Sequence, residues 1–143
     1  MKKNIPIILD GGLSFPLEEK KIQMNQNLWT AELLISNPEI IGDVHINYIN
    51  AGAEIITTSS YQASFKSLKE RGLNEIKSKK IILKSVKIIE ELRKKYNKKI
   101  IIAASIGPYG ASLSDGSEYI GMYNINEDKI YDFHKKKIDV LDK

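Results

Sequence analysis

Three short apolar runs, separated by helix-sized segments, constrain the fold of this 143-residue chain more than any other feature. Residues 5–9, 53–58 and 100–104 are rich in isoleucine, and their apolar character is largely continuous rather than alternating. Each run is too short for a helix and is typical of a strand buried on both faces of a parallel sheet. The order of runs and intervening segments therefore predicts an α/β fold in which helices cover parallel strands.

Asparagine residues mark the starts of three predicted helices. Asn37 precedes a proline, whereas Asn74 and Asn126 each precede a glutamate. Asparagine is a preferred N-cap, and proline or an acidic residue suits the first helical turn. On the last helix, Lys137 falls on the same side as Phe133 and other apolar residues. The apolar spacing predicts helices over residues 37–52, 74–97 and 126–143, the last continuing to the end of the sequence.

The side-chain inventory excludes several kinds of site. The chain has no cysteine, which rules out disulfides, a cysteine nucleophile and thiolate metal ligands from this chain. Its two histidines, His45 and His134, lie on separate predicted helices, and we interpret each as a core or surface residue rather than a metal ligand or base. The formal net charge of +4, from 22 basic and 18 acidic residues, is too small to indicate nucleic-acid binding.

A lysine-rich helix over residues 77–99 does not alter that conclusion. Glu90, Glu91 and several isoleucines lie among its lysines, which is typical of the solvated outer face of a helix. No segment approaches the ~18 consecutive apolar residues of a membrane span. Asn4 and Pro6 interrupt the first apolar stretch, which argues against a secretory signal peptide. We therefore expect a cytoplasmic protein with neither membrane nor nucleic acid as a partner.

Polar residues follow each predicted strand directly. Asp10 ends the first run, residues 57–60 (TTSS) end the second, and Ser105 ends the third. The segments after these ends are long, whereas the returns from helix to strand are short. Active sites of parallel α/β folds gather at the carboxyl ends of the strands. The sequence therefore predicts a functional site where these three ends meet.

Seven motifs together resemble the homocysteine S-methyltransferase family. They occur in the family's order, span nearly the whole chain, and are more similar to the branch that uses S-methylmethionine or S-adenosylmethionine than to the betaine-using branch. At Phe15 and Pro16 the sequence departs from that branch, which often has threonine and a polar residue there. The motifs are residues 8–13 (ILDGGL), 28–31 (LWTA), 37–41 (NPEII), 51–53 (AGA), 58–63 (TSSYQA), 105–111 (SIGPYGA) and 115–119 (DGSEY).

The resemblance implies a fold and an activity. The fold is a (β/α)8 TIM barrel, and the reaction transfers a methyl group from a sulfonium donor to homocysteine, giving methionine. Because a full barrel takes roughly 200 residues or more, residues 1–143 are expected to be the N-terminal portion of the homocysteine-binding domain. They correspond to its first three βα units, an incomplete barrel that stops before the fourth strand. The expected small-molecule partners are homocysteine and S-methylmethionine or S-adenosylmethionine.

The resemblance also implies a zinc ion in the intact family, held by three cysteine thiolates from the C-terminal half. Zinc binds the homocysteine sulfur and keeps it deprotonated, because a free thiol has a pKa near 8.5. This chain has no cysteine. We therefore expect it to bind no zinc at that position, assign it no catalytic or metal-binding residue, and expect it to be inactive alone.

The resemblance implies that this chain supplies one side of the substrate site. The substrate-binding candidates are Asp10, Gly11, Thr58, Ser60, Tyr61, Gln62, Ser105 and Gly107. Asp10 matches a carboxylate that faces the bound amino acid, and its alternative role is to cap a turn. Tyr61 and Gln62 fit packing under their loop equally well. The glycines between residues 107 and 121 fit turn geometry, and Trp29 fits packing better than stacking on substrate.

Two other hypotheses remain open. One is a non-enzymatic half-barrel that assembles with itself or with a separate C-terminal fragment, because the outer strands would have unpaired edges and the sheet an uncovered face. The other is a different small α/β binding domain, whose strands would be arranged in an order other than that of the sequence.

Overall fold

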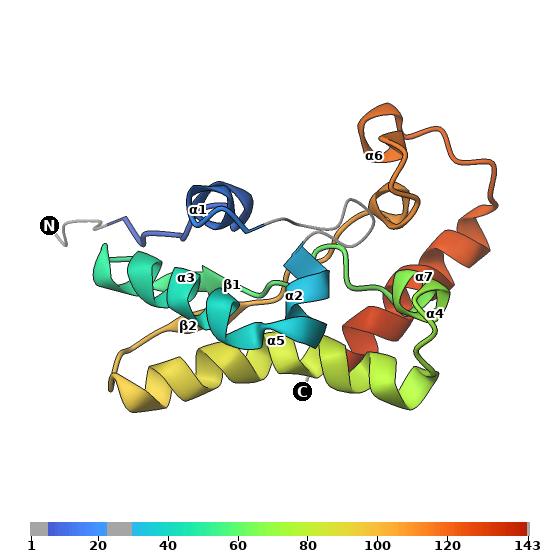
Figure 1. Ribbon diagram of the computed structural model, residues 1–143. Helices are drawn as coiled ribbons and strands as arrows, with labels where there is room; N and C mark the ends of the chain where they lie inside the picture. Colours follow the sequence, from blue (N-terminus) through green and yellow to red (C-terminus); the bar gives the residue numbers. More distant parts are fainter. Residues whose placement is uncertain (1–5, 23–29, 143) are drawn as a thin grey trace, which may run out of the picture.

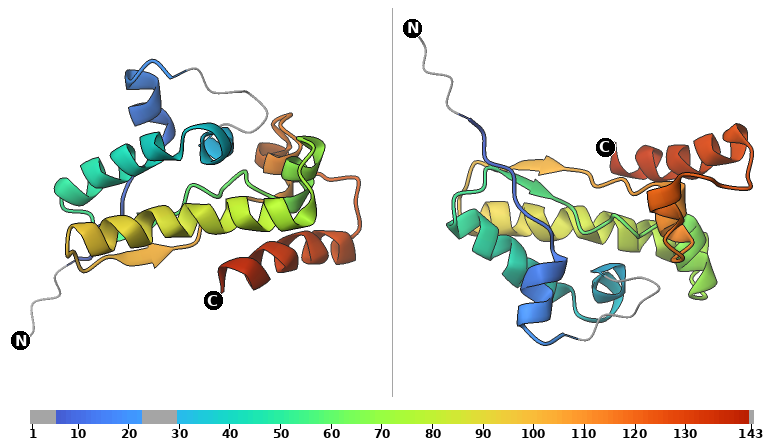
Figure 2. Two further views of the ribbon diagram at one scale, coloured as in Figure 1. Left: turned by 60° about the horizontal axis from the view of Figure 1, so that its bottom comes forward. Right: turned by 90° about the horizontal axis from the view of Figure 1, so that it is seen from above.

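The computed structural model describes residues 6–22 and 30–142. Figure 1 shows the long helix α5 running beside the two strands, and Figure 2 shows the same arrangement from two other directions. In chain order, the elements of the described residues are α1 (Ser14–Glu19), α2 (Thr30–Ser36), α3 (Pro38–Asn50), β1 (Ile55–Thr57), α4 (Phe65–Glu70), α5 (Glu75–Lys95), β2 (Ile101–Ala103), the 3-10 helix η1 (Tyr109–Ser112), α6 (Ser117–Ile120) and α7 (Glu127–Leu141).

The sheet is parallel and follows the order of the sequence. Strands β1 and β2 pair in parallel, with Ile55 opposite Ile101. Leu9 forms a single parallel bridge to Ile55, at the other edge of β1. The three predicted strand segments therefore lie side by side in sequence order. The predicted α/β fold with parallel strands is confirmed, and this order argues against the different α/β binding domain.

The expectation that the first run is buried on both faces is wrong for the described residues. In that run Leu9 forms a bridge and the Ile8 carbonyl accepts from the Glu54 and Ile55 amides. Ile5 lies outside the described residues, and Ile7, Ile8 and Leu9 are each more than half exposed. Residues opposite one another on neighbouring strands share a face of the sheet. Leu9, Ile55 and Ile101 thus form one face, which no element of the described residues covers. We call this surface the open face.

The other face of the sheet packs on helices. Ile56 points away from the open face and is fully buried. Helix α3 contacts β1 and helix α5 contacts β2. Around Ile56 gather Ile49, Ile89 and Ile100, which form the smaller of two buried clusters. The second cluster lies between helices α1, α2, α3, α4, α5 and α7.

The three helices expected from asparagine signals are all present. The side chains of Asn74 and Asn126 cap α5 and α7 by accepting from backbone N–H groups at 2.9 and 3.1 Å. Asn37 precedes α3 but makes no side-chain cap bond. Helix α7 ends at Leu141, earlier than predicted, because its apolar pattern does not itself specify a stop. Lys137, on the same side of this helix as Phe133, is buried, which the sequence pattern did not predict.

The shorter elements were not predicted. Helices α1, α2, α4 and α6 have four to seven residues each, too few for a helical period to emerge from the apolar pattern. Helix α4 does carry a local signal, since Ser64 and Ser67 form a reciprocal capping box. In the described residues, no helix combines the length and apolar character needed to cross a membrane.

Candidate functional site

The Asp10 carboxylate is held between the ends of two neighbouring strand segments. The Asp10 amide donates to the Ile55 carbonyl at 2.9 Å. In return, the Thr57 amide donates to Asp10 Oδ2 at 2.9 Å and the Thr57 hydroxyl to Oδ1 at 3.0 Å. Partial burial raises the pKa of Asp10, while the bonds from Thr57 act in the opposite direction. A carboxylate has about four acceptor positions, so Asp10 can accept further donors.

Tyr48 from α3 supports the turn that follows Asp10. Its hydroxyl donates to the Gly12 carbonyl at 2.8 Å. Burial and, to a lesser extent, the nearby Asp10 carboxylate raise the pKa of Tyr48. A Cβ at Gly11 would lie 2.8 Å from the Tyr48 hydroxyl oxygen. Glycine at position 11 therefore allows the backbone of this turn to pack closely against the Tyr48 side chain.

A closed ring of hydrogen bonds joins the loops after β1 and β2. The Ser60 hydroxyl donates to the Ser105 carbonyl at 2.8 Å, and the Ser105 amide donates to Thr58 Oγ1 at 3.0 Å. Because the Ser60 proton is already used, the Thr58 hydroxyl is the donor in the 2.7 Å bond between Thr58 and Ser60. The hydroxyls of Thr58 and Ser60, both buried, thus connect the two loops.

A cavity of about 530 Å³ lies at the carboxyl ends of the strands. Five of the eight predicted residues line it: Gly11, Thr58, Tyr61, Gln62 and Ser105. Asp10, Ser60 and Gly107 are not in its lining. Asp10 lies directly behind two lining residues, because Gly11 follows it in sequence and Thr57 binds its carboxylate. Five of the predicted residues therefore line one cavity, and Asp10 lies next to two lining residues.

Two further residues of the cavity lining have buried oxygen atoms without a hydrogen-bond partner in the described part of the chain. Among the described residues, neither Ser59 Oγ nor Glu118 Oε2 has a hydrogen-bond partner, and both atoms are buried. Both residues line the cavity, as does Tyr119. Burial, followed by Glu118 and two neighbouring tyrosines, raises the pKa of Tyr61. Ser59, Glu118 and Tyr119 were not among the predicted substrate-binding residues, although all three lie within the motifs at residues 58–63 and 115–119.

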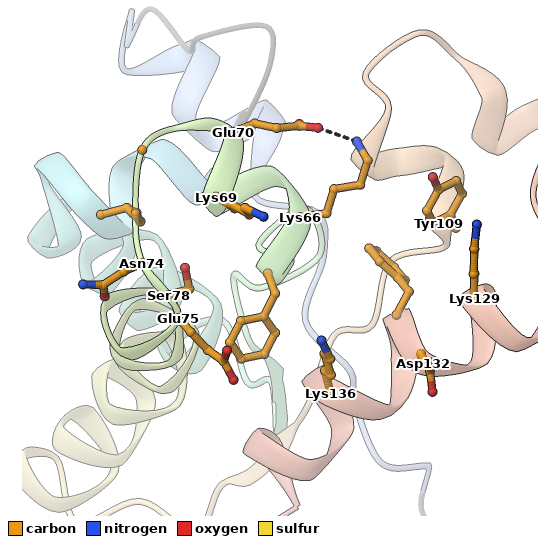
Figure 3. A pocket seen from close by; sticks show the side chains of 14 residues that line it. Lys66, Lys69, Glu70, Asn74, Glu75, Ser78, Tyr109, Lys129, Asp132 and Lys136 are labelled. Carbon is orange, nitrogen blue, oxygen red and sulfur yellow. Dashed lines mark hydrogen bonds and ion pairs between the residues drawn. The ribbon is translucent and has the colours of Figure 1, made fainter.

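A larger hollow of about 1050 Å³ lies elsewhere, between α4, the start of α5, η1 and α7. None of the eight predicted residues lines it. Figure 3 shows lysines and acidic residues around its rim, with Lys66 paired to Glu70 at 2.7 Å. Aromatic side chains, including Phe65 and Phe133, form its apolar part. Its lining shares no residue with the cavity at the strand ends, and we do not assign the candidate site to it.

The histidines do not assemble a metal site. His45 was expected to be either a core or a surface residue, and it is fully buried on α3. Burial lowers its pKa to about 4. His134 packs edge-on against Phe133, with ring centroids 5.1 Å apart. In residues 6–22 and 30–142, no three His, Cys, Asp or Glu side chains are placed to hold a metal ion. Trp29, considered for stacking on substrate, lies outside the described residues.

Comparison with known proteins identifies the family. The family model for homocysteine S-methyltransferase matches residues 7–143. Homocysteine S-methyltransferase YbgG of Bacillus subtilis is 43% identical over 94% of this chain and 46% of its own length. Homocysteine S-methyltransferase 1 of Arabidopsis thaliana is 42% identical over 94% of this chain and 45% of its own length.

A solved structure gives the same result. The metallated form of the homocysteine methyltransferase MmuM from Escherichia coli superposes with a TM-score of 0.87 at 38% identity, over 96% of this chain and 50% of that chain. The chain thus spans about half the length of the relatives it matches. It belongs to the homocysteine S-methyltransferase family and corresponds to the N-terminal half of its relatives.

Proposed function

We propose that residues 1–143 form the first three βα units of a (β/α)8 barrel, before its fourth strand. In this role they supply one wall of the homocysteine site of a methyltransferase that uses S-methylmethionine or S-adenosylmethionine. The observation that carries the proposal is the Asp10 carboxylate, held by Thr57 at the strand ends beside the cavity. Family membership and the sequence order of the strands support it.

The charges around the cavity suit the amino group of homocysteine. An ammonium group has three donors and no acceptor. Asp10 has acceptor capacity left, and Glu118, a second carboxylate, lies in the cavity lining. In this proposal Tyr61 and Gln62 border the bound amino acid. The other candidates, Gly11, Thr58, Ser60, Ser105 and Gly107, hold the surrounding loops in place.

The residues of this chain do not fit the zinc site that the family resemblance implies. That site requires thiolate ligands, and the sequence contains no cysteine. A zinc ion held by thiolates would lower the pKa of the homocysteine thiol from its ordinary value near 8.5, and this chain has no cysteine to hold one. We therefore assign no step of methyl transfer to these residues, and we limit their role to binding and orienting the amino acid.

Replacing Asp10 by asparagine tests the proposed binding role. Titrating the labelled chain with L-homocysteine is expected to shift amide resonances of residues 10–12, 57–62, 105 and 116–119. Asp10→Asn removes a charged acceptor while keeping its shape, so the dissociation constant is expected to rise about tenfold. Two-dimensional amide NMR measures both effects on the same sample.

Asp43→Asn is the matched control, because Asp43 is an exposed carboxylate on the outer helix α3. We expect this variant to bind like the original chain. Equal affinities for Asp10→Asn and the original chain would contradict the proposal, as would an unchanged spectrum. A parallel assay of methionine formation, with S-methylmethionine and added zinc, is expected to show no turnover by the chain alone.

The open face supports a second candidate function, a non-enzymatic half-barrel that assembles with itself or with a separate C-terminal fragment. Leu9 and Ile101 are 56% and 55% exposed and lie on the outer segments of the sheet. Strand edges with exposed apolar residues favour pairing with another chain. This candidate requires no chemistry from the cavity.

If the open face forms an interface with a second copy of the chain, the chain is expected to self-associate. At micromolar concentrations the chain is expected to sediment as a species larger than its 16.2 kDa monomer. Ile101→Lys places a charge on the open face and is expected to give a monomer, because burying that charge in an interface is costly. Ile76→Lys, at a more exposed isoleucine on α5 (69% against 55% for Ile101), is expected to leave association intact. A monodisperse monomer of the unmodified chain would argue against this candidate.

A further inference from the structure

A buried lysine joins the last helix to the wall of the cavity. Lys137 on α7 is 2% exposed. Its ammonium group donates to the Ser60 carbonyl and, at 3.3 Å, to the Tyr61 carbonyl. Burial lowers the pKa of Lys137 to about 8. Lysine is almost never fully buried without partners, and these two carbonyls are its partners.

The same backbone is confined from a second direction. Gly107, in the loop after β2, packs so closely that a Cβ there would collide with the Tyr61 carbonyl oxygen. The Ser60 hydroxyl meanwhile binds the Ser105 carbonyl. Two separate segments, the loop after β2 and helix α7, therefore confine the backbone of residues 60–62, although Lys137 is more than seventy positions away in sequence.

We propose that Lys137 is a positioning residue for the candidate site. It clamps the backbone of residues 60–62, so that the side chains of Tyr61 and Gln62 keep their places in the cavity wall. The consequence for homocysteine binding rests on the proposed function, whereas the clamp itself does not. The competing explanation is that the lysine stem only fills space in the core, in which case an apolar chain of equal length would serve as well.

The absence of cysteine permits a direct test on the full chain. Lys137→Cys introduces the sole thiol, which is alkylated in denaturant before refolding. Aminoethylation rebuilds a lysine analogue with its ammonium group, whereas propylation gives nearly the same length without charge or donors. Amide exchange is then followed by NMR at Ala63, which donates to the Ser60 carbonyl at 3.1 Å, and at Ser105, which donates to Thr58 Oγ1. Tyr96, at the far end of α5, is the reference.

The propylated protein is expected to exchange the Ala63 and Ser105 amides roughly tenfold faster than the original chain, because a charged hydrogen-bond donor is lost. The aminoethylated protein is expected to recover the original rates, with Tyr96 unchanged in both. Identical behaviour of the two alkylated proteins, folded or unfolded, would overturn the proposal. So would an equal acceleration at Tyr96, which indicates only global destabilisation. If this difference appears but homocysteine leaves the spectrum of the original chain unchanged, the proposed function fails and the clamp stands.

Discussion

Lowering the pH from 7 to 4 is expected to destabilise the fold by about 3 kcal/mol through His45 alone. His45 is fully buried, and neither ring nitrogen has a partner among the described residues. Burial lowers its pKa from 6.5 to about 4 in the folded chain. Between these values the unfolded chain binds a proton that the folded chain does not. The free energy of unfolding therefore falls as the pH drops through this window and is fully retained above it.

Urea unfolding at pH 7 and at pH 4, with the original chain and His45→Leu, measures this contribution. The variant is expected to lose less stability on acidification and to be about 1 kcal/mol more stable at pH 7, because two unpaired buried nitrogens are removed. His134→Leu, on the half-buried side of α7, is the control and is expected to keep the acid-sensitive window. Equal pH profiles for the original chain and His45→Leu would contradict the assignment.

Gly107→Ala is expected to reduce the free energy of unfolding by about 3 kcal/mol, the upper end of the usual cost of overpacking. The added Cβ would collide with the Tyr61 carbonyl oxygen. That oxygen belongs to the backbone and is also held by Lys137, so it cannot give way as the end of a flexible side chain would. The neighbouring cavity wall is expected to shift with it.

Gly12→Ala is the matched control for this substitution. A Cβ at Gly12 would have no atom within 4 Å, so the change is expected to alter stability by less than about 1 kcal/mol. Chemical denaturation of both variants gives the comparison. A Gly107→Ala protein as stable as Gly12→Ala would show that residues 60–62 yield easily, against the close packing described above.

The sequence determined those features that depend on short-range preferences. Isoleucine-rich runs indicated parallel strand segments, and the asparagines at 74 and 126 marked helix starts that their side chains do cap. The polar ends of those strands meet around one cavity, because parallel strands bring their carboxyl ends to the same edge. The motifs also indicated the family that the comparisons establish.

Only the tertiary structure decided how these residues share their roles. Thr58 and Ser60 were expected at the substrate, but their hydroxyls close a ring across two loops, a pairing that separations of about 45 residues conceal. Burial could not be inferred either. The sequence of an apolar run is the same whether or not a neighbouring layer covers it. Leu9 is exposed and Lys137 is buried, and neither could be predicted from its local sequence. Local preference determines which elements form, whereas contacts between distant segments determine which atoms remain free to bind a ligand.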